Sequence, residues 1–192
     1  LQTVRSIAPM GVTFIYIRQP EPLGLGHAVL CAQPVVGDEP FAVMLADDLI
    51  DGQQSAIGQL IEARKQLGGG NILAVQDVPK ADTKKYGIVG VEDSLATTSL
   101  VHEMVEKPDP DHAPSTLAVI GRYVLEPEIF ERLKKVQKGV GGEIQLTDAI
   151  AGQLNLNTTY SHRFDGIRYD CGSKQGFLDA TVRFARKAGY SI

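Results

Sequence analysis

The sequence predicts an α/β fold built on a mixed central sheet, and three observations carry that prediction. Strand-like and helix-like segments alternate through the first half of the chain, and shorter strand-like segments then follow one another. An unbroken apolar run over 41–46 ends in Asp47, Asp48 and Asp51. Such a run is typical of a strand buried on both faces of a sheet, with its charged end at the ligand-binding edge. No repeat or long linker divides the chain, so a single domain over 1–192 is expected.

The remaining elements follow from local pattern. A connector is predicted over 1–11, where a Pro-Met-Gly turn signal ends it. Segments rich in β-branched and aromatic residues predict strands over 13–18, 71–78, 86–91, 99–105, 118–125, 158–164 and 167–169. Helical spacing, or proline at a helix start, predicts helices over 28–33, 53–67, 127–136, 144–154 and 173–187. The clearest spacing is that of Ile57, Leu60 and Leu67, and Pro34 is expected to stop the helix over 28–33.

Charge and composition exclude several classes of function. The net charge of -4 and the dispersed Lys and Arg residues argue against a nucleic-acid partner that needs a basic surface. No apolar stretch approaches the roughly 20 residues of a membrane span, so no membrane partner is expected. No signal peptide is expected from the opening residues either, and the predicted location is the cytoplasm. Cys31 and Cys171 match no metal-binding spacing and are expected to be reduced thiols.

A loop containing two prolines and two glycines lies over 19–28. Its stretch Gly24-Leu25-Gly26-His27-Ala28 has only a superficial likeness to a dinucleotide-binding fingerprint. The third glycine position is Val29, and no acid ends the next strand at the distance expected for a ribose contact. A dehydrogenase is therefore disfavoured. The glycines permit close approach of the backbone to a flat ligand, and a plain turn before a helix is the alternative.

Acids at strand ends are the first candidates for chemistry. Asp47 follows the run over 41–46, and Asp170 ends the short strand before the last predicted helix. If the sheet brings these two carboxylates together, they suit Mg²⁺, which binds one or two protein carboxylates together with substrate phosphates. The alternative is that Asp47 or Asp48 caps the next helix or turns the chain.

A second candidate is Glu106-Lys107, which stands before Pro108 at the end of a predicted strand. The carboxylate suits vicinal sugar hydroxyls and the ammonium suits a phosphate. Neighbouring side chains on a strand point to opposite faces, but this alternation fails at a strand end, so both can reach one pocket. The alternative is a solvated ion pair. Farther along, Glu143 and Thr147 are placed for capping or polar contacts near a helix start.

Taken in order, these motifs resemble one family, the bacterial UTP–glucose-1-phosphate uridylyltransferases, over essentially the whole chain. The resemblance rests on Arg18-Gln19, Leu23 to Ala28, Val35 to Pro40, Leu45 to Asp48, Tyr86-Gly87, Val105 to Pro108, Gly121 to Tyr123, Gly142 to Ile150 and Asp170 to Gly172. It implies a Rossmann-like mixed central sheet of the sugar nucleotidyltransferase type.

The resemblance also implies roles on the nucleotide and metal side. Gln19 and Gly24 match positions that read the uracil base. Asp47 matches the aspartate that holds Mg²⁺ near the nucleotide, and Asp170 matches the second aspartate on the metal side. Mg²⁺ is therefore the implied cofactor, and UTP the implied nucleotide.

On the sugar side, Gly87 and Glu106 match contacts to glucose hydroxyls, and Lys107 matches the contact to the sugar phosphate. Gly121 and Glu143 match positions lining the same side. The implied reaction is in-line attack of glucose 1-phosphate on UTP, giving UDP-glucose and pyrophosphate without a covalent enzyme intermediate. Asp47, Lys107 and Asp170 are then the catalytic residues.

The sequence departs from the family at its start. Family members begin with a strand and a glycine-rich loop that holds the triphosphate, and nothing in 1–19 matches that loop. The resemblance therefore implies an N-terminally incomplete domain with an exposed sheet face or edge. A smaller departure is Ala46, where many relatives have proline.

Two other readings stay open. One is a related sugar-1-phosphate nucleotidyltransferase that uses dTTP or CTP, and the other is a truncated fragment that binds a sugar nucleotide without catalysis. The resemblance also implies a homo-oligomer, a dimer or a tetramer.

Overall fold

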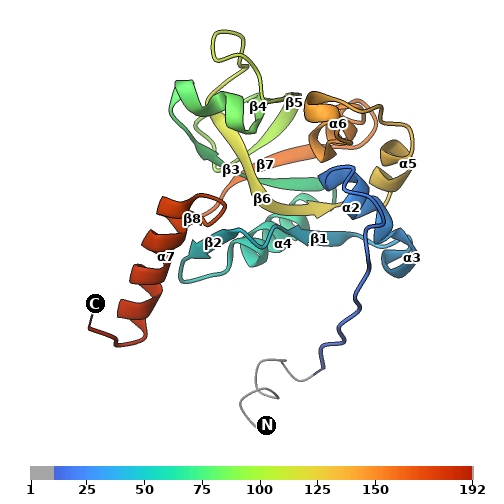
Figure 1. The fold of residues 1–192 in the computed structure, drawn as a ribbon. Helices are drawn as coiled ribbons and strands as arrows, with labels where there is room; N and C mark the ends of the chain where they lie inside the picture. The colour runs from blue at the N-terminus through green and yellow to red at the C-terminus, as the bar shows by residue number, and fades with distance from the viewer. Residues whose placement is uncertain (1–10, 192) are drawn as a thin grey trace.

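In the computed structural model, which describes residues 11–191, a mixed six-stranded sheet forms the centre of the fold (Figure 1). Its strands, in spatial order, are β1 (Phe41–Met44), β6 (Leu117–Leu125), β3 (Asn71–Asp77), β7 (Thr159–Arg163), β5 (Thr98–Glu106) and β4 (Gly87–Val91). β3 and β7 run parallel and the other neighbours are antiparallel, which confirms the predicted mixed sheet. The connector predicted over 1–11 lies almost entirely outside the described residues.

A second, two-stranded sheet pairs β2 (Asp48–Asp51) with β8 (Ile167–Asp170). Its register places Asp48 opposite Asp170, so two segments far apart in the sequence meet at one end of this sheet. In Figure 1 it lies to one side of the six-stranded sheet, close to the last helix, α7 (Lys174–Lys187).

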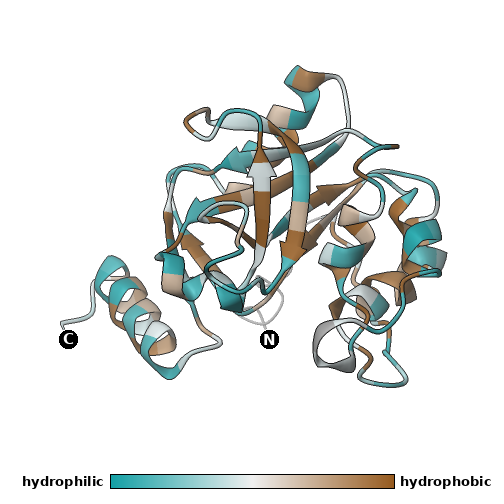
Figure 2. Cartoon of the chain, turned by 90° about the horizontal axis from the view of Figure 1, so that it is seen from above, coloured by the Kyte–Doolittle hydropathy of each residue, from teal (hydrophilic) through white to brown (hydrophobic). Residues whose placement is uncertain are grey.

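The core occupies both faces of the large sheet, because successive residues of its central strands point to opposite faces. On β3, Leu73 and Val75 pack with the helices α2 (Leu25–Cys31), α5 (Ile129–Leu133) and α6 (Leu146–Ala151). Ile72 and Ala74 pack on the other face against α4 (Ala56–Leu67). Figure 2 shows the resulting concentration of hydrophobic residues on the strands of the sheet.

The prediction that the strand at 41–46 is buried on both faces is wrong. β1 is an edge strand four residues long, and its only strand partner among the described residues is β6. Phe41 stacks on Phe130 with the ring centroids 4.9 Å apart, whereas Ala42 and Met44 on the other face are exposed. The strands buried on both faces are β3 and β6.

The strand predicted over 13–18 is also absent from the structure. These residues have no strand assignment, and Tyr16 is 91% exposed. A β-rich composition forms a strand only where another strand accepts and donates the backbone hydrogen bonds. None of the described strands lies beside this segment, which extends away from the sheet in Figure 1.

The predicted helices exist, but several of their limits differ. α4 begins after Ser55, whose side chain accepts a hydrogen bond from the Gly58 amide, and it ends at Gly68 in the left-handed conformation. α2 begins at Leu25 inside the glycine loop. Pro34 does not end a helix. It stands in the first turn of α3 (Gln33–Val36), where no intrahelical hydrogen bond needs its missing N–H.

α5 and α6 are shorter than the predictions over 127–136 and 144–154. Two 3₁₀ turns, η1 (Lys80–Lys85) and η2 (Val140–Gly142), complete the elements. None of the helices within residues 11–191 combines the length and the apolar character that crossing a bilayer requires. Cys31 and Cys171 are both free thiols, as predicted.

Candidate active site

A cavity of about 480 Å³ opens where the two sheets meet. It is bounded by the turn after β1, the ends of β4, β5 and β8, and the start of α6. Seven of the nine site residues singled out from the sequence line it: Asp47, Gly87, Glu106, Lys107, Gly121, Glu143 and Asp170. The fold therefore brings residues from six separate segments to one place.

The two strand-end acids converge, as the sequence alone could not establish. The amide of Cys171 donates a hydrogen bond of 2.7 Å to the carbonyl oxygen of Asp47, which joins the segment after β8 to the turn before β2. A Cβ added to Gly172 would lie 3.1 Å from Asp170 Oδ1 and 3.3 Å from Asp47 Oδ2. Both carboxylates therefore approach a single point, which a side chain at this glycine would fill.

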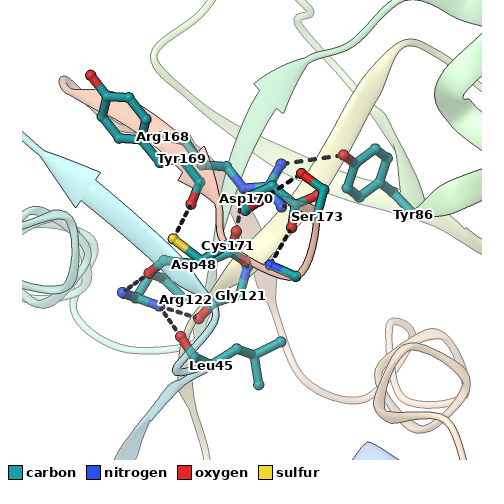
Figure 3. A network of polar contacts seen from close by, with 11 residues as sticks. Leu45, Asp48, Tyr86, Gly121, Arg122, Arg168, Tyr169, Asp170, Cys171 and Ser173 are labelled. Carbon is teal, nitrogen blue, oxygen red and sulfur yellow. Dashed lines mark hydrogen bonds and ion pairs between the residues drawn. The ribbon is translucent and has the colours of Figure 1, made fainter. Parts of the chain in front are cut away.

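Asp48, the neighbour of Asp47, has a different role. Its side chain is only 7% exposed, and Arg168 Nε donates to its Oδ1 while the Gly121 amide donates to its Oδ2 at 2.9 Å. Arg122 completes the arrangement by donating to the carbonyl oxygens of Leu45 and Asp48 (Figure 3). The suggestion that Asp47 or Asp48 caps the following helix is wrong, because Ser55 caps α4.

Glu106 and Lys107 do reach the same cavity, and the backbone explains how. Lys107 has a φ of 46°, so the chain leaves the extended conformation and the alternation of strand side chains ends there. The Lys107 amide donates to the Tyr86 carbonyl at 2.9 Å, which holds this conformation against the start of β4. The Glu106 carboxylate lies 3.4 Å from Lys107 Nζ, and its side chain is only 9% exposed. That burial argues against a purely solvated ion pair.

Thr147 fixes the orientation of Glu106. Its Oγ1 donates to Glu106 Oε2 at 2.7 Å from the first turn of α6. Gly87 faces Glu106 across the β4–β5 ladder, and a Cβ at this position would lie 2.5 Å from Thr147 Cγ2. The contact between these strands and α6 therefore requires glycine, and the wall of the cavity is tightly packed here.

Gln19 and Gly24 do not line the cavity. The Gln19 amide nitrogen lies 3.1 Å from the Gly24 carbonyl oxygen and 2.9 Å from His27 Nδ1, so these residues form their own cluster at the start of α2. A Cβ on Gly24, whose φ is 103°, would lie 2.7 Å from Glu143 Cβ. The glycine loop thus packs directly against the segment that leads to the cavity.

Two cationic residues of the cavity were missed from the sequence. Lys85 lines it at the end of η1, where its pairing with Asp82 raises the pKa of the ammonium group. Arg168 lines it from β8; burial opposes its charge, but the hydrogen bonds that it donates to Tyr86 and Asp48 hold its pKa above the ordinary value. The only sequence signal for either residue is its place next to a candidate motif: Lys85 directly precedes Tyr86-Gly87, and Arg168 lies two residues before Asp170.

Burial and neighbouring acids both shift the pKa values of two groups near the cavity. Burial, and then the charge of Glu106, raise the pKa of the Asp148 carboxyl group. Burial, followed by the charges of Glu106 and Asp48, raises the pKa of the Tyr123 hydroxyl well above its usual range. Lys85, Lys107 and Arg168 balance these acids around the cavity. A site with both signs of charge suits a ligand that carries hydroxyls, phosphates and a divalent cation.

Comparison with known proteins gives consistent matches. The model of the nucleotidyl transferase family matches residues 2–187. A UTP–glucose-1-phosphate uridylyltransferase of Pseudomonas aeruginosa is 46% identical over 172 residues, which are 88% of this chain and 61% of that protein. A second enzyme of that name, from Staphylococcus saprophyticus, is also 46% identical, with 90% of this chain and 59% of that protein covered.

Solved structures agree with these matches. A UDP-glucose pyrophosphorylase complexed with UDP-glucose superposes with a TM-score of 0.86 at 39% identity, covering 91% of this chain and 66% of that one. A UTP-bound UGPase of Acinetobacter baumannii gives 0.85 at 39% identity, covering 97% and 65%. The chain thus spans 59–61% of the length of the two curated relatives above.

Proposed function

The chain belongs to the nucleotidyl transferase family, and we propose that it serves the transfer of a uridylyl group from UTP to glucose 1-phosphate. The products are UDP-glucose and pyrophosphate. The observation that carries this proposal is the convergence of Asp47 and Asp170 on the cavity that also holds Glu106 and Lys107. The names of relatives at 46% identity support the choice of uridylyl transfer.

The donors at Asp47 and Asp170 fit Mg²⁺. Both carboxylates reach the space beside Gly172, which supplies hard oxygen ligands from two sides. Within residues 11–191, no group of three or more His, Cys, Asp or Glu side chains could hold a metal ion by itself. Two carboxylates with further oxygens from water and phosphate are the arrangement that Mg²⁺ prefers. When bound, the ion would supply Lewis-acid stabilisation of charge on the phosphates.

The other residues bind and orient the sugar phosphate. Lys107 offers its ammonium group to the attacking phosphate and reduces the repulsion between two polyanions. Glu106, held by Thr147, presents a carboxylate that can accept hydrogen bonds from sugar hydroxyls. Gly87 and Glu143 line the same side of the cavity as this carboxylate. Holding the phosphate in line with the leaving group lowers the entropic part of the barrier.

The nucleotide is proposed to bind on the other side of Glu143. The cluster of Gln19, Gly24 and His27 at the start of α2 packs against this residue and lies outside the cavity. A base bound beside this loop would place its phosphates toward Asp47. We propose further that the protein works in the cytoplasm as a homo-oligomer, as the resemblance to the family implies.

The test is pyrophosphate release from UTP and glucose 1-phosphate with Mg²⁺, with dTTP and CTP compared at equal concentration. Asp47→Ala should lower the rate more than tenfold, which corresponds to about 1.4 kcal/mol. Because the Asp47 side chain is exposed, the fold should remain intact. Asp111→Ala is the matched control, since Asp111 pairs with Lys80 at 2.9 Å and does not line the cavity.

Three results would overturn parts of the proposal. A rate for Asp47→Ala within tenfold of the wild type would remove its metal role. Faster turnover with dTTP or CTP would assign the protein to a related nucleotidyltransferase activity. Binding of UDP-glucose without any pyrophosphate release would favour a binding fragment without catalysis.

A further inference from the structure

The two sides of the candidate active site come from different sheets. Asp47 and Asp170 lie beside the two-stranded sheet, whereas Glu106 and Lys107 lie at the end of β5 in the six-stranded sheet. A ligand that contacts both sides binds well only if the distance between them is fixed before it arrives. The structure should therefore contain a side chain that joins the two sides.

Arg168 has the contacts that such a residue needs. Its side chain is 10% exposed and lines the cavity from β8. Nε donates to Asp48, and one terminal nitrogen lies 3.8 Å from Asp170 Oδ2. The other terminal nitrogen donates to the Tyr86 hydroxyl at 3.3 Å, and the guanidinium carbon lies 5.3 Å from the centre of the Tyr86 ring (Figure 3). One planar group thus contacts β2, β8 and the residue before β4.

The path continues from Tyr86 to the phosphate-binding residue. The carbonyl oxygen of Tyr86 accepts the hydrogen bond from the Lys107 amide, and Gly87 follows Tyr86 directly at the start of β4. A shift of Tyr86 would therefore move Lys107 and Gly87 together. On the other side, a shift of Arg168 would move the carboxylate of Asp170, because the two residues share one short strand.

We propose that Arg168 is a positioning residue that holds Asp170 at a fixed distance from Lys107 and thereby couples binding of the divalent ion to binding of the sugar nucleotide. The inference rests on the proposed function for the identity of these ligands. Arginine suits the task because its rigid fork can bond two partners at once while its face packs on an aromatic ring. Lysine at this position would keep the charge beside Asp48 but would lose the fork.

The test measures the Kd of UDP-glucose by calorimetry without a divalent ion and with Mg²⁺. The ratio of the two values reports the coupling and needs no turnover. In Arg168→Lys we expect the ratio to fall at least about fivefold, the lower end of typical coupling between sites. Arg163→Lys is the matched control, because Arg163 is also paired with an aspartate, Asp77, but stands on β7 outside the cavity. Its ratio should equal that of the wild type.

A urea titration first establishes that each variant is folded. If Arg168→Lys does not fold, Tyr86→Phe takes its place as the test variant, because it removes one hydrogen bond and keeps the ring. The ratio of its two Kd values should fall at least about twofold. An unchanged ratio in the deciding variant, or a wild-type ratio near one, overturns the inference and leaves the proposed function standing. Failure of the wild type to bind UDP-glucose under either condition instead overturns the proposed function.

Discussion

Replacing Gly121 by alanine should destabilise the protein at the point where β6 meets the turn after β1. The added Cβ would lie 2.5 Å from Asp48 Oδ2 and 2.7 Å from Leu45 Cβ, where ordinary contacts are 3.4–4 Å. Either the turn or β6 must therefore move by almost 1 Å. The Gly121 amide also donates to Asp48 Oδ2 at 2.9 Å, so the same movement weakens a hydrogen bond to a buried carboxylate.

The size of the effect follows from these two contributions. Overpacking of a tight site costs about 1–3 kcal/mol, and a hydrogen bond to a charged group contributes about 1.5–3 kcal/mol. The cost of overpacking, together with partial loss of the hydrogen bond to Asp48, lowers the free energy of unfolding by about 3 kcal/mol. In a domain of this size, each kcal/mol of lost stability lowers the Tm by about 2–4 °C, so the Tm of Gly121→Ala should be lower by about 6–12 °C.

Calorimetry and urea denaturation of Gly121→Ala measure this loss, with Gly152→Ala as the matched control. The Cβ added at Gly152 has the Asp148 carbonyl oxygen as its nearest neighbour, at 3.3 Å, and the glycine follows α6 with a helical backbone. That variant should change stability by less than about 1 kcal/mol. A loss below about 1 kcal/mol in Gly121→Ala would refute the argument that close approach requires this glycine.

Three further predictions concern the parts around the site. Ser173→Ala removes the acceptor of the Gly176 amide at the start of α7, and should cost about 1 kcal/mol in the unfolding free energy measured by urea titration. Hydrogen bonds from Lys187, and secondly from Arg183, lower the pKa of Asp51. The stabilisation that ionised Asp51 contributes is therefore complete above the ordinary aspartate pKa of about 4, and it is lost as the pH falls through the lower pKa of the folded state. Asp51→Asn should accordingly flatten the acid side of a curve of unfolding free energy against pH. Leu60→Ala empties a site with 0% exposure and should cost about 2–5 kcal/mol in the same titration, and a cost under about 1 kcal/mol would contradict the position of α4 in the core.

Sequence pattern predicted best the elements whose environment is set by their own residues. α4 has its apolar spacing, its Ser55 cap and its glycine stop within one short stretch. β3 and β6 are rich in apolar residues, and most of their residues are buried on both faces. In each case local preference and tertiary burial agree, so a reading of the residues in order suffices.

The failures share one physical cause. The runs over 13–18 and 41–46 have strand composition, but the number of neighbours that a strand acquires is decided elsewhere in the chain. Among the described residues, the first run has no strand beside it and the second has β6 on one side only. The composition of a segment indicates how well it fits a β-sheet, but it does not show how many neighbouring strands the segment will have.

The candidate site shows the same limit. Asp47, Glu106, Lys107 and Asp170 were found because each lies at or just beyond the end of a predicted strand, and strand ends are recognisable locally. Arg168 was not found, because its partner Asp48 lies 120 residues away and only the β2–β8 register brings the two together.

The β2–β8 register also gives the adjacent acids Asp47 and Asp48 different roles. Asp47 stands in the turn after β1 and Asp48 begins β2, and the sequence alone does not say which of the two is buried. The structure decides this by placing a guanidinium and a backbone amide at Asp48, whose charge would otherwise be costly to bury. Asp47, with an exposed side chain, keeps its carboxylate available beside Asp170. One acid therefore stabilises the turn, and that turn presents the other acid to the cavity.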